Sequence, residues 1–340
     1  MPLPSEKTSN RPCQLCGGTA TVELEGTPTI QRCDECGLLA LDQFPGPREI
    51  AACYQEEYYR EGTGNRFLAI LEDAIHFFRW LRVRAIRRWE KGPASLLDVG
   101  CGRGLLLELF QKRGWQVLGT QLSGTAARAA RENRGVDVFC GELTDLDAES
   151  GRFRVVTLYH VLEHLPRPVE YLERIRDLLA EDGLLVVEVP DFDSPGFRAL
   201  GLRNFCVDYP HHLTFFSGST LRGLLERCGF RVFHVSHFSL EYSVYTTLQN
   251  LLNLLPGSPN RLYRALQDNQ EGRRLRRSPR TWLHAGLATA LAPPALLISL
   301  SSLVLPWGNT VCLYSRPARS AVDSTSCRPS PGRETAGQPG

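Results

Sequence analysis

Between Ala94 and Phe238 the sequence alternates short apolar runs with stretches in which apolar residues recur at helical spacing. This alternation predicts βαβ units and therefore an α/β fold, a doubly wound and mostly parallel sheet with helices on both faces. The expected strands are SLLDVG, WQVLGTQL, VDVFC, RFRVVTLYH, GLLVVEVP and FRVFHVSHF, followed much later by TVCLYSR. The expected helices between them are Leu105–Arg113, Thr125–Arg134, Pro168–Ala180 and Ser219–Cys228.

A glycine-rich loop, LLDVGCGRG (Leu96–Gly104), joins the first expected strand to the first expected helix. Glycines at such a junction let the backbone turn sharply and approach a ligand closely. The pattern by itself indicates only a nucleotide-like ligand, because several nucleotide-binding folds share it. The dinucleotide fingerprint requires a small residue where this chain has Leu105, and Asp98 is not part of that fingerprint. The loop therefore argues against a nicotinamide cofactor.

Four segments, in order, resemble class I S-adenosylmethionine-dependent methyltransferases that carry an N-terminal zinc ribbon. The segments are LLDVGCGRG, VLGTQLS (Val117–Ser123), YHVLEHLPRP (Tyr159–Pro168) and HHLTFFSGSTLRGLLERCGFRV (His211–Val232). The resemblance covers roughly residues 13–238 and returns at 308–316. It implies a Rossmann-like methyltransferase fold, S-adenosylmethionine as the cofactor, and methyl transfer as the activity. The cofactor's methionine part is then expected at a loop formed by Asp98, Gly100, Cys101, Gly102 and Gly104.

The expected ribose contact departs from the family pattern. The family usually has an acidic residue at the end of the second strand, where this chain has Gln121, followed by Leu122. Glutamine can accept one hydrogen bond and donate another, so it is compatible with cofactor binding. The adenine is expected near Gly141, Glu142 and Leu143. Because of Gln121, a non-catalytic relative stays open as an alternative. A nicotinamide-dependent oxidoreductase is a weaker alternative, since the HVLEH segment also argues against it.

Two CxxC pairs near the N-terminus predict a zinc ribbon. Cys13 and Cys16 are separated from Cys33 and Cys36 by sixteen residues, a spacing that fits a four-thiolate zinc site. A closed shell of four sulfur ligands leaves no position for a substrate, so a structural role is expected. The alternative, recognition of nucleic acid, is disfavoured because the segment TVELEGTPT between the pairs is acidic.

Histidines that follow the expected strands are candidates for removing a proton from the acceptor. Methyl transfer from a sulfonium is an in-line displacement, for which the enzyme aligns the acceptor and, where needed, deprotonates it. Ligands bind at the carboxyl ends of the strands in doubly wound sheets. His160 lies at such an end and is expected to contact cofactor or substrate, while His211 and His212 precede a helix on the same side. His160, His211 and His212 are thus the candidate catalytic residues, although either member of the pair could instead hold the loop. His164 is more typical of a residue that begins a helix.

No Asp, Glu, Lys or Arg occurs from Thr281 to Ser315, and a basic cluster precedes this stretch. Its length would permit a transmembrane helix, but Pro293-Pro294 splits it and the last strand must rejoin the sheet. A helical hairpin over 281–308 is therefore expected. Two alternatives stay open: peripheral contact with a membrane, the arginines meeting anionic headgroups, or a buried helical pair in a substrate-binding insertion. The basic cluster comprises Arg273, Arg274, Arg276, Arg277 and Arg280.

The predicted organisation combines these segments with the overall composition. A net charge of +2 argues against nucleic acid as a partner. The polar start MPLPSEKTSN lacks an apolar signal core, so we expect a cytoplasmic protein that could lie peripherally at the inner face of the membrane. The acceptor is expected to be a small or lipid-linked metabolite, a glycan precursor or a quinone-like phenol, methylated on oxygen or carbon. The expected divisions are a zinc ribbon (1–47), a helical lid (48–93), the methyltransferase core (94–238), a helical hydrophobic insertion (239–308), a final core strand (309–316) and a disordered tail (317–340).

The expected lid contains a helix at Arg66–Glu90 that carries several arginines. We expect them on a solvated helix face or, alternatively, as an addition to the basic surface near the insertion. They are Arg79, Arg82, Arg84, Arg87 and Arg88.

Overall fold

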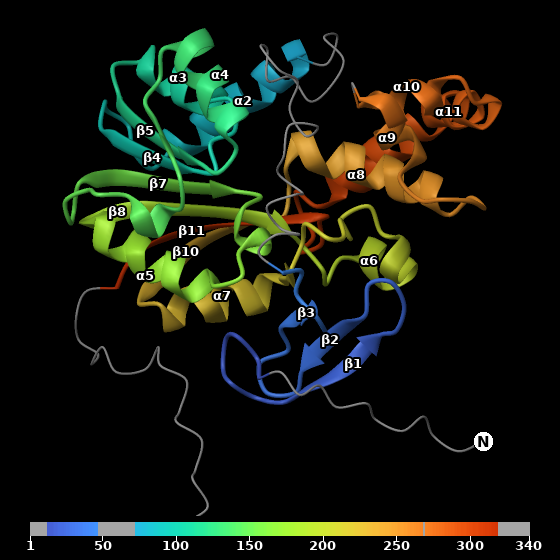
Figure 1. Ribbon diagram of the computed structural model, residues 1–340, viewed down its shortest axis with the longest axis horizontal. Coiled ribbons are helices and arrows are strands. Elements are labelled where there is room, and N and C mark those ends of the chain that lie inside the picture. Colours follow the sequence, from blue (N-terminus) through green and yellow to red (C-terminus); the bar gives the residue numbers. More distant parts are fainter. Residues whose placement is uncertain (1–11, 47–71, 268, 319–340) are drawn as a thin grey trace, which may run out of the picture.

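The computed structural model describes residues 12–46, 72–267 and 269–318 (Figure 1). The predictions for residues 48–71 of the lid and for residues 319–340 of the tail lie outside the described residues.

A seven-stranded sheet with the order β10-β11-β8-β7-β4-β5-β6 forms the centre of the fold. Neighbouring strands from β8 to β6 pair in parallel, whereas β11 is antiparallel to both β8 and β10. The strand order reverses between β4 and β7, and ligands of doubly wound sheets bind at such a reversal. The predicted strands, including the last, are confirmed: β4 (Ser95–Val99), β5 (Gln116–Gln121), β6 (Val138–Cys140), β7 (Phe153–Tyr159), β8 (Leu179–Pro190), β10 (Phe230–Ser236) and β11 (Thr310–Pro317).

Helices cover both faces of this sheet, as predicted (Figure 1). Successive strand residues point to opposite faces, so Leu96 packs in one apolar cluster and Leu97 in the other. Because both faces are covered, the strands are apolar along nearly their whole length. One face is covered by α2 (Glu72–Ile86), α3 (Leu105–Gln111) and α4 (Gly124–Arg134), and the other by α5 (Pro168–Leu178) and α7 (Gly218–Arg227).

A second, antiparallel sheet with the order β1-β2-β3-β9 is shared between the cysteine-rich segment and the core. The first three strands are β1 (Ala20–Leu24), β2 (Ile30–Cys33) and β3 (Leu39–Leu41), whereas β9 (Thr214–Phe215) lies between α6 (Pro195–Leu200) and α7. Ile30 and Leu39 pack with Phe192 and Phe215 in one apolar cluster. The sequence did not predict this pairing, which fixes the N-terminal segment beside the loop that carries His211 and His212.

Four helices lie between β10 and β11, where the insertion was expected: α8 (Leu240–Asn253), α9 (Arg261–Leu266), α10 (Gln270–Arg276) and α11 (Pro279–Ser301). The predicted hairpin is wrong, and so is the buried helical pair, because α11 continues through Pro293-Pro294 and is mostly exposed. Each proline removes its own N–H and frees the carbonyl four residues earlier. Those carbonyls belong to Thr289 and Ala290, which are exposed like the two prolines. They can therefore be solvated, and the helix need not end.

Candidate functional site

The glycine loop follows β4 and requires its glycines. Gly100, Gly102 and Gly104 adopt φ values of 68°, 55° and 72°, a left-handed conformation that favours glycine. A Cβ at Gly100 would lie 2.6 Å from Val161 Cγ2, so the loop after β7 also closes on this position. The buried Cys101 lies between the first two glycines. At its three glycines the loop thus presents bare backbone at the carboxyl edge of the sheet.

Asp98 lies beneath the loop and is 5% exposed. Its Oδ1 accepts a hydrogen bond from Thr157 Oγ1 at 2.6 Å, which joins β4 to β7. Burial raises the pKa of the Asp98 carboxyl to about 6, although the hydrogen bond from Thr157 opposes the shift. Asp98 therefore links β4 to β7 directly before the loop begins.

The residues expected at the ribose and adenine lie at the ends of β5 and β6, which pair through Gln121 and Cys140. Gln121 Oε1 accepts a hydrogen bond from the backbone N–H of Leu122 at 2.8 Å. The side-chain amide of Gln121 therefore folds back onto the turn that follows it. Leu122 is 46% exposed and offers an apolar surface on which a base could lie. Glu142 Oε2 accepts a hydrogen bond from Tyr171 Oη at 3.0 Å, and Leu143 is buried. The Oε1 acceptor of Gln121 is thus engaged by its own turn, and the carboxylate of Glu142 by Tyr171.

His160 sits at the end of β7 between two buried carboxylates. Its Nε2 is 3.1 Å from Glu188 Oε1, its Nδ1 is 3.4 Å from Glu163 Oε1, and the Tyr242 ring lies over it at 3.8 Å between centroids. Burial alone would lower the pKa of His160, but the two carboxylates outweigh it and raise the pKa to about 9. Its φ of 55° is an unfavourable conformation for a non-glycine residue, of the kind that accumulates at functional sites. At neutral pH this imidazole is a cation and already carries the proton that a general base would accept.

Two arginines of α2 complete a buried charge network, and the prediction of a solvated or membrane-facing position is wrong for both. Arg82 is 9% exposed, pairs with Glu188 at 3.0 Å and Glu241 at 3.3 Å, and stacks over the ring of Tyr159. Arg79 forms an ion pair with Glu241 as well. The reason is that β8 and α8 bring carboxylates beneath this face of α2, and a buried carboxylate requires a cation. The network therefore connects α2 and α8 to His160.

The loop before β9 brings His211 to His164 and His212 to Glu163. His164, in the 3₁₀ helix Leu162–His164, lies with its Nδ1 2.9 Å from the carbonyl oxygen of His211. His212 places Nδ1 2.7 Å from the carbonyl of Cys206 and Nε2 3.9 Å from Glu163 Oε1. Burial and the neighbouring His212 lower the pKa of His164 to about 4, so this ring is neutral. His211 Nδ1 lies 3.5 Å from Asp208 Oδ2.

Sequence reasoning missed Arg82, Glu188 and Tyr242 as parts of the site. Glu188 gave one usable signal, since it is a charge inside the apolar run GLLVVEVP, where charges are rare unless they are paired. Arg82 and Tyr242 gave none, because both lie on helices where polar residues are ordinary. Only the packing of α2 and α8 around His160 reveals them.

The four cysteines of the predicted ribbon meet in space. Their sulfur atoms all lie within 4.8 Å of one another, with Cys13–Cys36 and Cys16–Cys33 distances of 3.5 and 3.4 Å. A tetrahedral zinc–thiolate centre, with bonds of about 2.3 Å, has sulfur atoms roughly 3.8 Å apart. Leu15 N and Gly18 N donate to two of the sulfurs, as suits thiolate ligands. The four side chains therefore fit a structural zinc ion.

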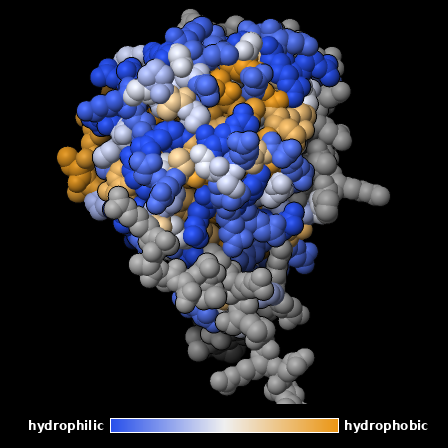
Figure 2. Space-filling model, turned by 90° about the vertical axis from the view of Figure 1, so that its left-hand side faces the viewer, coloured by the Kyte–Doolittle hydropathy of each residue, from blue (hydrophilic) through white to orange (hydrophobic). Residues whose placement is uncertain are grey.

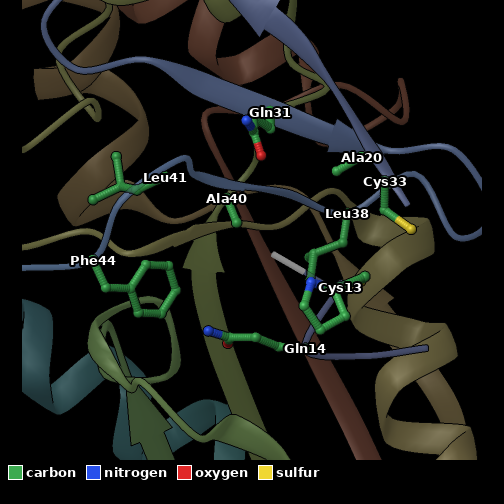
Figure 3. A pocket seen from close by; sticks show the side chains of 10 residues that line it. Cys13, Gln14, Ala20, Gln31, Cys33, Leu38, Ala40, Leu41 and Phe44 are labelled. Atoms are coloured by element: carbon green, nitrogen blue, oxygen red, sulfur yellow. The ribbon is translucent and has the colours of Figure 1, made fainter. Parts of the chain in front are cut away.

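A hollow beside these cysteines is formed by residues of the same N-terminal segment (Figure 3). Apart from its cysteines it is lined by apolar and amide side chains, among them Gln14, Gln31 and Phe44. None of the histidines or carboxylates around His160 contributes to it. We therefore do not assign methyl transfer to this hollow.

The comparisons with known proteins agree with the predicted family. A family model described as a methyltransferase domain matches residues 66–235, half of the chain. A ubiquinone biosynthesis O-methyltransferase of Rhodopseudomonas palustris (strain HaA2) is 32% identical over 121 residues, covering 32% of this chain and 47% of the relative. One of the same name from Glaesserella parasuis serovar 5 (strain SH0165) is 30% identical over 125 residues, covering 33% of this chain and 53% of the relative. The chain thus spans about half the length of these curated relatives.

Solved structures that are similar to this chain include two methyltransferases. An S-adenosylmethionine-dependent methyltransferase from Archaeoglobus fulgidus has a TM-score of 0.44 at 20% identity, over 70% of this chain and 94% of that one. The 1,6-didemethyltoxoflavin-N1-methyltransferase of Burkholderia thailandensis has a TM-score of 0.46 at 16% identity, over 87% of this chain and 98% of that one. With the family match over half of its residues, the chain belongs to the methyltransferase-domain family and is a class I S-adenosylmethionine-dependent methyltransferase.

Proposed function

We propose that this methyltransferase methylates a hydroxyl oxygen of a lipid-linked acceptor, with a quinone-like phenol favoured over a glycan precursor. Two features support the proposal. The curated relatives are named as O-methyltransferases of ubiquinone biosynthesis, although they match only a third of this chain. The insertion also exposes an apolar surface that a water-soluble acceptor would not require.

The observation that carries the proposal is the apolar surface of α11. This 23-residue helix is apolar enough to cross a membrane, only 17% of its most apolar window is buried, and Ser299 attaches its covered side to Thr247 of α8. An exposed apolar surface of this size marks an interaction site. By contrast, hydrophilic residues cover most of the face viewed in Figure 2, with smaller hydrophobic areas between them. The exposed apolar side chains of α11 and of the segment that follows it include Trp282, Leu283, Leu297, Ile298, Leu303, Val304 and Trp307.

We place α11 in the interface of a membrane rather than across it. The chain returns to the central sheet at Thr310, only nine residues after the helix ends at Ser301. Arg273, Arg274 and Arg277 are exposed on or directly after α10, near enough in sequence to meet anionic headgroups. The protein would then be cytoplasmic and peripheral at the inner face.

His211 is our candidate for the base. His160 already carries a proton at neutral pH, and His212 is hydrogen-bonded at Nδ1 and buried. His211 is partly exposed and has Asp208 beside its Nδ1, a carboxylate that can orient the ring and stabilise the protonated form. S-adenosylmethionine would supply the methyl group at the glycine loop, and His211 would take the acceptor's proton. We propose that the ribbon's zinc ion is structural.

Two measurements test the function. The protein is incubated with S-adenosylmethionine labelled in its methyl group and with the membrane and soluble fractions of a bacterial extract. We expect label in an organic-extractable product from the membrane fraction, and His211→Ala should reduce it at least about hundredfold. Label found only in water-soluble products would contradict the lipid-linked acceptor and favour the glycan precursor or another small metabolite.

Flotation with phosphatidylglycerol vesicles tests the surface. The wild type should float, whereas Leu297→Glu should stay at the bottom, since a charge in the apolar contact opposes insertion. Glu149→Lys, an exposed change in the segment between β6 and β7, serves as the control and should float. If the wild type does not float with the vesicles, the membrane proposal is wrong.

A further inference from the structure

Glu163 is a fully buried carboxylate that lies beside three histidines. It is 0% exposed, and within the described parts of the chain neither oxygen accepts a hydrogen bond. The nearest ring nitrogens are His160 Nδ1 at 3.4 Å, within ion-pair distance but outside hydrogen-bond geometry, and His212 Nε2 at 3.9 Å. A charge taken out of water needs close pairing or a metal ion. His160 also contacts Glu188, so its ring does not serve Glu163 alone.

Two imidazoles beside this carboxylate are oriented like metal ligands. A carbonyl oxygen can only accept, so the Nδ1 atoms of His164 and His212, beside the carbonyls of His211 and Cys206, must carry hydrogen. When such a ring is neutral, its lone pair therefore lies on Nε2. Histidines that bind metals almost always donate their other N–H in this way. The two rings meet edge to face, with centroids 4.7 Å apart.

The three side chains are close enough to share one ion. One nitrogen of each histidine and one oxygen of Glu163 all lie within 4.8 Å of one another. Ligands on a common metal, with bonds of about 2.1 Å, lie roughly 3 to 3.5 Å apart, so small side-chain rotations would suffice. Two imidazole nitrogens and one carboxylate suit zinc, iron(II), cobalt(II) or nickel(II) rather than magnesium or calcium, which prefer oxygen ligands.

We propose that Glu163, His164 and His212 form a second metal site, distinct from the four cysteines, for a divalent transition-metal ion. The site lies where the two sheets meet, because Leu213 N donates to the carbonyl of Glu163 just before β9 pairs with β3. Three protein ligands leave coordination positions open. If the proposed function holds, the acceptor hydroxyl could occupy one of them, and a metal there would lower its pKa. The site itself does not depend on that acceptor.

Cobalt(II) titration of the full, zinc-loaded protein tests the proposal. We expect one further cobalt ion per chain by calorimetry, with weak visible absorption and without the near-ultraviolet charge-transfer band that thiolate ligands produce. Glu163→Gln, which keeps the shape, and His212→Ala should each weaken this binding at least about tenfold. His211→Ala removes the adjacent histidine, which is not one of the three ligands, and should keep the second ion.

The outcomes separate the metal site from the other proposals. No cobalt beyond that exchanged into the thiolate site, or equal uptake by the wild type, Glu163→Gln and His212→Ala, overturns the second site. S-adenosylmethionine binding, measured by calorimetry for each variant, verifies that it is folded. If His212→Ala does not fold, cobalt binding by the isosteric Glu163→Gln variant tests the site. Failure of methyl transfer to lipids would leave the cobalt count unchanged, so the proposed function and the metal site fail independently.

Discussion

Replacing Arg82 by methionine removes a buried charge while keeping most of the side-chain volume. Arg82 lies between Glu188 at 3.0 Å and Glu241 at 3.3 Å, and all three side chains are at most 15% exposed. Breaking a buried ion pair by removing one partner costs about 3 to 5 kcal/mol, because the other charge stays buried without compensation. Arg79 still pairs with Glu241 and His160 still contacts Glu188, so we expect the lower end, about 3 kcal/mol.

The sign of the pH dependence gives a second check on Arg82→Met. Burial by itself raises the pKa of Glu188, but Arg82 and His160 outweigh it and hold the pKa below its usual value. Such a carboxylate adds stability above its unfolded pKa of about 4.3, and this contribution is lost as the pH falls through the folded value. The loss in the free energy of unfolding of Arg82→Met should therefore be complete at pH 7 and become smaller below about pH 4.

Urea unfolding at a series of pH values measures both quantities. Arg222→Met is the matched control, because Arg222 pairs with Glu226 on the exposed surface of α7 and should cost less than about 1 kcal/mol. A loss of under about 1 kcal/mol for Arg82→Met at pH 7, equal to that of the control, would refute the reasoning that the network is buried and coupled.

Three further predictions concern the cofactor site and its surroundings. Gly100→Ala, whose Cβ would meet Val161 at 2.6 Å, should abolish S-adenosylmethionine binding in calorimetry, whereas Gly223→Ala, in α7 with open space around it, should not. Since the folded pKa of His160 is raised to about 9, its contribution to stability, about 3 kcal/mol, is complete below pH 6.5 and is lost as the pH rises through 9. Urea unfolding should show this loss in the wild type and not in His160→Gln. Gln121→Glu places a carboxylate where the family resemblance implies a contact with both ribose hydroxyls. The variant should therefore bind the cofactor severalfold more tightly, and an unchanged dissociation constant would contradict the ribose assignment.

The central fold could be predicted from local patterns in the sequence. Each strand of the large sheet reads as an apolar run, because both faces of the sheet are covered, and each helix between them shows its own spacing. The left-handed glycines of the loop and the spacing of the four cysteines are likewise local properties, since they depend on residues close together in the chain. These features could be inferred without knowing which elements become neighbours.

The remaining features depend on contacts between distant segments, and local patterns misled or were silent there. Pro293-Pro294 suggested a break, but α11 continues because the freed carbonyls lie on its exposed side. The sequence predicted a solvated position for Arg82, but in the fold β8 and α8 place Glu188 and Glu241 against it.

His160 illustrates the same division within a single residue. The sequence by itself determined that it ends a strand beside the cofactor loop. Only the tertiary structure decided that two carboxylates, from Glu163 nearby and Glu188 on the next strand, hold its proton. The physical reason is that backbone conformation follows from neighbours in sequence, whereas the charge state of a buried group follows from whatever the fold packs around it.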